Sequence, residues 1–353
     1  MRMICIGPKS SLREAIACIN RHEAQIALVV DDEDRLVDTV TDGDIRRAIL
    51  SGMDLDAPVK TLRSRRTRSP YPQPVTAHKD TEPSDLLRLM EERCVRQVPL
   101  LDDEQRVVGL STLRELLKSD SVPLQAVVMA GGYGSRLRPL TEDVPKTMLR
   151  VGDRPLLESI VEQLRESGIK RLHLATHYKG DVIARHFGDG RDFGVEIQYV
   201  EEDKPLGTAG ALCLLGSTED PVLVVNGDIL TRVDFRAMLE FHTDHAADMT
   251  VAVRRYESQI PYGVIDSDGV NVLRVAEKPY VSHFINAGIY LLDPKVCQCI
   301  PNGQSYDMTE LINKLVADGR RVISFPVHEY WLDIGRIEEY QKAQQEYHQV
   351  FKK

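Results

Sequence analysis

The chain has 353 residues, 42% of them hydrophobic and 28% charged, and a net charge of −9. This length is too great for one compact core, so we expect two or three domains of ordinary soluble composition. Residues 1–119 carry 19 Lys and Arg against 20 Asp and Glu, a net charge of −1, which leaves −8 for the remainder. Neither part has the basic balance of a nucleic-acid-binding protein, and no apolar run approaches the roughly 20 residues that span a bilayer. The N-terminus has no signal-peptide pattern and the six cysteines are scattered, which indicates a cytoplasmic protein with reduced thiols.

The first third of the chain contains an internal repeat. Residues 29–50 align with residues 100–118 at an offset of 71, and the same offset places a helical pattern at 12–19 on another at 83–90. Each copy is expected to form a helix, a strand, an Asp-rich turn, a strand and a helix. Because one copy buries little apolar surface by itself, we expect the two copies to pack together.

This repeat resembles a tandem pair of CBS (cystathionine-β-synthase) domains over residues 1–120, with copies at about 1–58 and 59–119. An arginine run at 63–68 precedes Pro70 and Pro72 and is interpreted as an exposed connection between the copies.

In the CBS family a segment written Gly-x-x-Thr-x-x-Asp holds the ribose of an adenine nucleotide. The first copy has Thr41 and Asp44 at these places but no glycine, and the second has Thr112 but Glu115 for the aspartate. The resemblance implies a regulatory nucleotide at Thr41, Asp44 and Thr112. The alternative is a CBS pair that only dimerises the protein or braces the domain that follows.

Strand and helix patterns alternate in the second part of the chain, from 124 to 350. The polar stretch 118–123 marks the boundary before it. Strands are expected at 125–130, 171–175, 195–200, 222–226, 249–254, 263–266, 271–276 and 287–292. Helices are expected at 155–167, 180–187, 208–215, 234–244, 307–318 and 336–350. This alternation predicts an α/β domain with a Rossmann-like, mostly parallel mixed sheet and helices on both faces, which binds ligands beyond the carboxyl ends of its strands.

A glycine-rich loop follows the first of these strands. Gly131-Gly132-Tyr133-Gly134 comes directly after the apolar run 126–129, and the cations Arg136 and Lys146 follow. Open backbone amides next to two cations favour a polyphosphate ligand. A Walker loop is excluded because Ser135-Arg136 stands where Lys-Ser or Lys-Thr is required. A dinucleotide fingerprint is excluded because Leu137 occupies the place of its third glycine.

The longer pattern from Gly131 through Thr141, followed by Pro145-Lys146 and Met148-Leu149, resembles the signature of the sugar-phosphate nucleotidyltransferases. The resemblance extends to about residue 345. It implies attack of a sugar 1-phosphate oxygen on the α-phosphorus of a nucleoside triphosphate, with pyrophosphate as the leaving group. It also implies Mg²⁺, because the reaction brings two polyanions together.

The same resemblance implies roles for individual residues. Arg136 and Lys146 are the catalytic cations that grip the triphosphate. Nucleotide contacts are implied for Ala130, Gly131, Gly132, Gly134, Ser135, Glu202, Gly207, Thr208 and Gly227. Sugar-phosphate contacts are implied for Gly263, Glu277, Lys278 and Asn286. Asp228 and Asp333 are implied as ligands of Mg²⁺, although a helix N-cap is the alternative role for Asp333.

The choice of substrates is also a matter of resemblance. The stretch from Glu202 to Ala211, with Gly207-Thr208-Ala209 in it, resembles the guanylyltransferase branch, including mannose-1-phosphate guanylyltransferases, and implies GTP. The CBS fusion resembles bacterial enzymes of surface-sugar pathways that make a GDP-amino sugar for nonulosonic acids, which implies glucosamine 1-phosphate as the acceptor.

Mannose or heptose 1-phosphate, and thymidylyl or uridylyl transfer, remain alternatives. A homo-oligomer is expected. The alternative from another class is a non-catalytic nucleotide sensor.

Overall fold

The computed structural model describes residues 4–22, 24–63, 73–117, 122–202, 204–216 and 218–351. The chain divides into two compact units. Unit 1 comprises Met1–Pro123, Glu166–Ile169 and Asp234–Phe241, and unit 2 comprises Leu124–Arg165, Lys170–Val233 and His242–Lys353. Most of the arginine run at 63–68 and most of the expected boundary at 118–123 lie outside the described residues.

Unit 1 contains the two copies of the repeat. The first copy consists of β1 (Cys5–Ile6), α1 (Leu12–His22), β2 (Ile26–Val30), β3 (Leu36–Thr41), α2 (Asp42–Leu50) and α3 (Lys60–Arg63). The second consists of β4 (Ala77–His78), α4 (Pro83–Arg93), β5 (Gln97–Leu101), β6 (Val107–Thr112) and α5 (Leu113–Leu117). Each copy forms a three-stranded sheet, in the orders β1-β2-β3 and β4-β5-β6. The predicted repeat is therefore confirmed.

The offset of 71 is preserved in the strand register. Ile26 pairs with Thr41 in the first copy and Gln97 pairs with Thr112 in the second. The Asp-rich turns also match, because Asp31 and Asp102 each accept backbone N–H groups two and four residues later. These short turns let each strand pair reverse tightly.

Reciprocal backbone hydrogen bonds join the two copies within unit 1. Leu36 donates to the carbonyl of Gln105 at 3.2 Å, and Val107 donates to the carbonyl of Asp34 at 3.0 Å. The donors and acceptors are again related by 71 residues, so an approximate two-fold relation connects the copies. The expectation that they pack together is confirmed.

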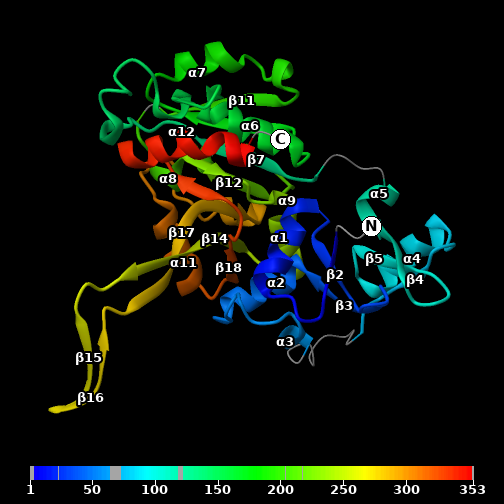
Figure 1. Ribbon diagram of the computed structural model, residues 1–353. Helices are drawn as coiled ribbons and strands as arrows, with labels where there is room; N and C mark the ends of the chain where they lie inside the picture. Colours follow the sequence, from blue (N-terminus) through cyan, green and yellow to red (C-terminus); the bar gives the residue numbers. More distant parts are fainter. Residues whose placement is uncertain are drawn as a thin grey trace. The chain divides into compact units, whose positions relative to one another are not determined.

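A seven-stranded sheet forms the centre of unit 2 (Figure 1). Its order is β11-β10-β7-β12-β17-β14-β18. The strands are β7 (Gln125–Met129), β10 (Arg171–Thr176), β11 (Glu196–Glu201), β12 (Val222–Asn226), β14 (Met249–Gln259), β17 (Tyr280–Leu292) and β18 (Val322–Pro326). Only β17 runs antiparallel to its neighbours, β12 and β14, which confirms a mostly parallel mixed sheet.

Both faces of this sheet are covered. Val127 and Val128 point to opposite faces and are both fully buried. One face packs against α8 (Gly207–Gly210) and α11 (Met308–Ala317), since Ala209, Leu311 and Leu315 share a core with Val127. Other helices of the unit are α6 (Leu156–Glu166), α7 (Gly180–Phe187) and α12 (Ile337–Phe351).

The structure departs from the expected elements in three places. The helix expected at 208–215 is one turn of α-helix, α8, followed by a 3₁₀ turn at Ala211–Leu214, because two glycines and a short apolar stretch do not sustain a longer helix. β14 and β17 are longer than expected, because their outer halves pair with each other beyond the central sheet. β15 (Gly263–Asp268) and β16 (Asn271–Glu277) form a separate antiparallel sheet instead of joining the central one.

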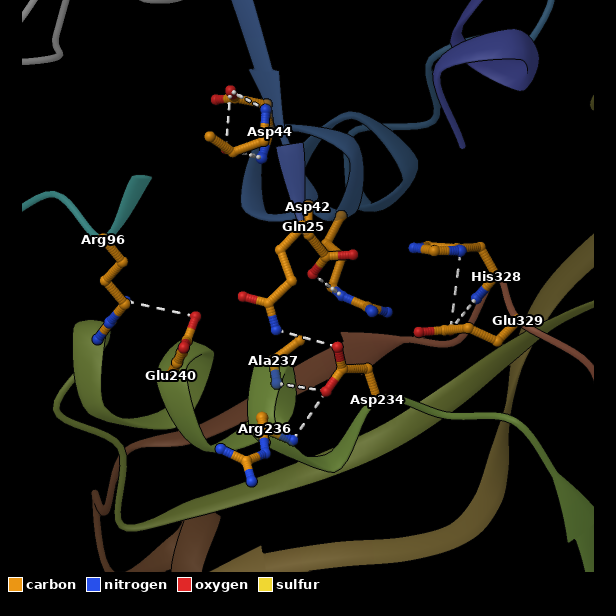
Figure 2. A network of polar contacts seen from close by, with 12 residues as sticks. Gln25, Asp42, Asp44, Arg96, Asp234, Arg236, Ala237, Glu240, His328 and Glu329 are labelled. Carbon is orange, nitrogen blue, oxygen red and sulfur yellow. Dashed lines mark hydrogen bonds and ion pairs between the residues drawn. The ribbon is translucent and has the colours of Figure 1, made fainter. Parts of the chain in front are cut away.

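Helix α9 (Phe235–Asp244) begins at a capped turn that is grouped with unit 1. Asp234 Oδ1 accepts from the N–H groups of Arg236 and Ala237, at 2.9 and 3.0 Å (Figure 2). Its other oxygen accepts from Gln25 Nε2 at 3.0 Å. Such bonds satisfy amides that the first turn of a helix leaves without partners.

Gly152, in the turn between β8 (Arg150–Val151) and β9 (Arg154–Pro155), provides a test of packing in unit 2. It has φ +66°, and a Cβ there would lie 2.2 Å from the Tyr347 ring of α12, whereas Gly319 has φ +70° with open space around it. We expect Gly319→Ala to cost about 1 kcal/mol of unfolding free energy from strain alone. Gly152→Ala should cost roughly 2 kcal/mol more because of the clash. Urea unfolding measures both, and equal losses would contradict the packing of α12 on this turn.

Candidate active site

The glycine loop begins at the carboxyl end of β7, next to the end of β12. Gly134 has φ +63°, and a Cβ there would lie 2.9 Å from both Lys146 Cβ and Thr141 Cγ2. Thr141 Oγ1 donates to the Gly134 carbonyl at 2.8 Å. Glycine is therefore required for the loop to close on the segment that carries Lys146. Of the other predicted loop residues, Gly132 and Ser135 are exposed, and Gly131 lies beside His177 and Glu202.

Lys146 and Asp228 meet at this edge of the sheet. The Lys146 Nζ lies 2.5 Å from Asp228 Oδ2, and the lysine side chain is only 10% exposed. Gly227, the residue before Asp228, donates to the Met129 carbonyl at 2.9 Å. The parallel pairing of β7 and β12 thus places residues 82 apart in the sequence in direct contact.

Asp333 and Arg136 complete a cluster of four charged side chains. β13 (Ile229–Thr231) pairs with β19 (Trp331–Asp333), with Ile229 opposite Asp333, and Ile334 donates to the Asp228 carbonyl at 2.9 Å. The exposed Arg136 approaches from the glycine loop, and its guanidinium lies 3.8 Å from the place of a Cβ at Gly335. The structure therefore brings together Arg136, Lys146, Asp228 and Asp333.

The electrostatics of Asp333 reflect this crowding. Partial burial, followed by the nearby Asp228 carboxylate, raises the pKa of Asp333, while Lys146 and Arg136 oppose that rise. None of the hydrogen bonds or ion pairs of the described residues uses its side-chain oxygens. Asp228 and Asp333 thus place two carboxylates close together, and the oxygens of Asp333 are available to a ligand. Such a donor set suits a hard divalent cation.

Three buried oxygens nearby have no hydrogen-bond partner in the described part of the chain. They are Thr147 Oγ1, in the residue after Lys146, Asn226 Oδ1, at the end of β12, and Glu339 Oε2, in the first turn of α12. Glu339 also contributes to the raised pKa of Asp333. Buried oxygens of this kind are usually satisfied by water or a ligand, so the site fits a hydrated ion such as Mg²⁺, held by Asp228 and Asp333.

Glu202 lies on the other side of the glycine loop, after β11. Its Oε2 accepts from the Leu206 N–H at 2.8 Å, and its Oε1 is 3.5 Å from the place of a Cβ at Gly131. One carboxylate oxygen thus orients the turn that leads to Gly207, and the other faces the glycine loop. Thr208 has a structural contact, because its hydroxyl accepts from the Met308 N–H at the start of α11.

The residues expected to hold the sugar phosphate lie on or beside the β14–β17 ribbon. Gly263 pairs with Glu277 across the β15–β16 hairpin, and Lys278 donates its N–H to the Tyr262 carbonyl. Glu277 and Lys278 are exposed, and no described hydrogen bond or ion pair joins their side chains to the charged cluster. Asn286, on β17, donates to the Tyr290 hydroxyl at 2.8 Å.

The expected ribose-binding residues of unit 1 are engaged with each other. Thr41 caps α2 by accepting from the Asp44 N–H, and Asp44 Oδ2 accepts from both the N–H and the hydroxyl of Thr41. Asp44 Oδ1 pairs with Arg47 at 2.8 Å. Thr112 and Glu115 form the corresponding backbone bonds in the second copy. A nucleotide would have to share these groups with the caps.

His177 and Tyr133, which no sequence motif singled out, lie beside the loop. His177 Nδ1 is 2.7 Å from the Glu202 carbonyl, and its Nε2 is 3.1 Å from the Tyr133 hydroxyl. The rings of Tyr133 and Tyr178 are 5.3 Å apart. His177 directly follows β10, a neighbour of β7, and this position at a parallel strand end was the signal that could have identified it.

Comparison with known proteins identifies the class. The model of the nucleotidyl transferase family matches residues 125–350, and the CBS domain model matches residues 1–51 and 69–121. The chain therefore belongs to the nucleotidyl transferase family and carries CBS domains at its N-terminus.

Several proteins named as mannose-1-phosphate guanylyltransferases are similar to this chain. The mannose-1-phosphate guanyltransferase of Pichia angusta is 35% identical over 227 residues, and the mannose-1-phosphate guanylyltransferase of Mycobacterium tuberculosis is 35% identical over 225 residues. Each match covers 62% of this chain and 62% of the relative, so the chain spans under two thirds of their length. The crystal structure of HddC from Yersinia pseudotuberculosis, complexed with GMP-PN, matches with TM-score 0.50 and 26% identity over 63% of this chain and 99% of that one. No helix among the described residues is long and apolar enough to cross a membrane.

The carboxylate pair can be tested by metal binding. We expect Asp228→Asn and Asp333→Asn each to weaken Mn²⁺ binding by roughly ten- to a hundred-fold, since each removes one anionic ligand. Electron paramagnetic resonance titration with Mn²⁺, with and without a non-hydrolysable triphosphate, measures this. Asp266→Asn is the matched control, because Asp266 is an exposed carboxylate on the β15–β16 hairpin, paired with Arg274. Equal affinities in all three variants would remove the metal assignment.

Proposed function

We propose that the protein transfers a guanylyl group from GTP to a sugar 1-phosphate, giving a GDP-sugar and pyrophosphate. The observation that carries the proposal is the convergence of Arg136, Lys146, Asp228 and Asp333 at the carboxyl ends of β7 and β12. Two cations and two carboxylates at one strand edge suit a magnesium triphosphate. Membership of the nucleotidyl transferase family supports the same reaction class.

The chemistry requires no nucleophilic side chain, because the sugar phosphate is itself an anion at neutral pH. One of its oxygens forms a bond to the α-phosphorus of GTP, and the bond from that phosphorus to the bridging oxygen of the β-phosphate breaks. Pyrophosphate leaves with the electron pair. Asp228 and Asp333 would hold Mg²⁺, which would supply charge neutralisation for the phosphates.

Lys146 and Arg136 position the triphosphate. Without ligand, Lys146 and Asp228 neutralise each other at 2.5 Å. With substrate bound, the Lys146 ammonium group would pair with the phosphates, and Asp228 would be free to hold the cation that accompanies them. Arg136, which is exposed at the mouth of the loop, stabilises the charge that develops on the departing pyrophosphate.

The base is assigned to guanine on two grounds. Glu202 Oε1 faces the glycine loop while its partner oxygen is held by Leu206, and guanine offers an N1–H and an exocyclic amine that such an oxygen can accept. The relatives named as guanylyltransferases support this assignment. Ala130, Gly131, Gly132, Gly134, Ser135, Gly207, Thr208 and Gly227 are proposed to line the rest of the nucleotide site.

For the acceptor we retain glucosamine 1-phosphate, with mannose and heptose 1-phosphate as the alternatives. Gly263, Glu277, Lys278 and Asn286 are the proposed contacts, with Lys278 on the phosphate and Glu277 on sugar hydroxyls. The CBS pair is proposed to bind a regulatory nucleotide through Thr41, Asp44 and Thr112. A cytoplasmic location stays a prediction.

A matrix of triphosphates and sugar 1-phosphates tests the function. We expect pyrophosphate release with GTP and glucosamine 1-phosphate, and no turnover in Asp228→Asn, whose circular dichroism should match that of the parent protein. Turnover only with UTP or dTTP would replace guanine by uracil or thymine as the base that the enzyme accepts. Tight nucleotide binding without turnover for any pair would instead support the non-catalytic sensor.

The assignment of Glu202 can be tested separately. Glu202→Gln replaces an acceptor pair by one acceptor and one donor, so we expect kcat/KM for GTP to fall about 10- to 100-fold relative to ATP or UTP. Glu201→Gln is the matched control, since Glu201 is the exposed residue immediately before it. A fall of the same size in both variants, or for every base, would show that Glu202 does not read the base.

A further inference from the structure

His177 connects two parts of the candidate active site through its two ring nitrogens. Nδ1 lies 2.7 Å from the Glu202 carbonyl, and Nε2 lies 3.1 Å from the hydroxyl of Tyr133. Because a carbonyl oxygen can only accept a hydrogen bond, Nδ1 must carry the proton. In the neutral imidazole Nε2 is then an acceptor, and the Tyr133 hydroxyl donates to it. The chain of hydrogen bonds therefore runs in one direction, from Tyr133 through His177 to Glu202.

Glu202 is held at three points, and His177 supplies one of them. The Glu202 N–H donates to the Thr176 carbonyl at 3.0 Å, and Oε2 accepts from the Leu206 N–H at 2.8 Å. The bond from His177 fixes the remaining backbone group, the carbonyl. With its backbone and one carboxylate oxygen held, Glu202 keeps Oε1 at a fixed position, 3.5 Å from the place of a Cβ at Gly131.

The glycine loop is closed independently of the Tyr133 hydroxyl. Thr141 Oγ1 donates to the Gly134 carbonyl at 2.8 Å, and a Cβ at Gly134 would lie 2.9 Å from Thr141 Cγ2. These contacts hold the residue directly after Tyr133. The bond from Tyr133 to His177 is therefore not needed to form the loop, and what it adds is a link between the loop and the Glu202 turn.

Burial does not require a tyrosine at position 133. Tyr133 is 50% exposed, and its ring lies 5.3 Å from the ring of Tyr178. A phenylalanine would make the same ring contact, but it could not donate to His177. The hydroxyl bond is thus the contact that distinguishes tyrosine from phenylalanine here.

We propose that His177 is a positioning residue that sets the separation between the Glu202 carboxylate and the glycine loop. This inference rests on the proposed function, in which Glu202 accepts from guanine and the loop holds the triphosphate. A nucleoside triphosphate has to reach both groups at once, and groups that are already held at the right separation lose less freedom when it binds. His177 therefore strengthens the binding of the whole guanine nucleotide, and not that of its phosphates alone.

The two bonds of His177 can be separated by substitution. The amide nitrogen of an asparagine can take the place of Nδ1, so His177→Asn keeps the bond to Glu202 and loses the bond to Tyr133. Tyr133→Phe removes that same bond from the other side and keeps the ring. We expect each variant to raise the Kd for GTP about 3- to 10-fold. The double variant should raise it no further, because both changes remove one shared interaction.

Isothermal titration calorimetry of the full chain measures these affinities, with Mg²⁺ present and without a sugar phosphate. Inorganic tripolyphosphate is the second probe, since it can occupy the loop but has no base. Its Kd should change less than twofold in every variant. Tyr199→Phe is the matched control, because Tyr199, on β11, donates its hydroxyl to the Gly188 carbonyl at 2.8 Å and so loses a similar bond outside the loop. It should leave both Kd values unchanged.

The tautomer is measured separately, by nitrogen NMR of the unliganded protein. His177 should carry its proton on Nδ1, and Tyr133→Phe should shift the resonance of Nε2 because that nitrogen loses its donor. His177→Asn identifies the signal by its absence. A proton on Nε2 would contradict the chain of hydrogen bonds and with it the proposal.

Three binding results would also overturn the proposal. They are an unchanged Kd for GTP in Tyr133→Phe, losses that multiply in the double variant, and an equal loss of tripolyphosphate affinity, which would mean that the bond only stabilises the loop. Circular dichroism confirms that the variants are folded. Binding is read without turnover, so a parent protein that binds GTP but releases no pyrophosphate overturns the proposed reaction and not the role of His177. A parent protein that binds no GTP overturns both.

Discussion

The close contact between the ends of β7 and β12 is the constraint on which the candidate site depends. Gly227 donates to the Met129 carbonyl, and a Cβ at this glycine would lie 2.7 Å from that carbonyl oxygen and from Thr147 Cγ2. Any side chain here would push the two strand ends apart. Asp228 would then lose its contact with Lys146, and the pairing of β13 with β19 that brings in Asp333 would shift with it.

Burial strengthens the electrostatic interaction between Lys146 and Asp228. A lysine that is 10% exposed loses much of its hydration, and Asp228 restores part of that loss. The pair is neutral as a whole, and it places an ammonium group and a carboxylate side by side at the carboxyl ends of β7 and β12. Burial, followed by the neighbouring Asp228 carboxylate, raises the pKa of Asp333, so a second carboxylate at this edge is held at a cost.

Elsewhere in the molecule, two regions differ in how fully their local structure is stabilised by internal contacts. The CBS copies repeat their register, their Asp turns and their helix caps at one offset, because each copy satisfies the same local bonds. The β15–β16 hairpin has the opposite character. Its two strands pair with each other, but its exposed apolar side chains have no cover within the described chain, and Gly263 and Glu277 pair at its inner end.

The sequence by itself determined the repeat, the alternating elements of unit 2 and the glycine loop, because these depend on local periodicity and on residue types that only one backbone tolerates. The family resemblance also pointed to the four charged residues, with Arg136 and Lys146 in the long motif and Asp228 and Asp333 at separate later positions. Only the tertiary structure decided that Lys146 contacts Asp228 and that β13 pairs with β19, which brings Asp333 to the same place. Those outcomes depend on which strands become neighbours, and the pairing of residues 82 or more positions apart is not encoded in any local pattern.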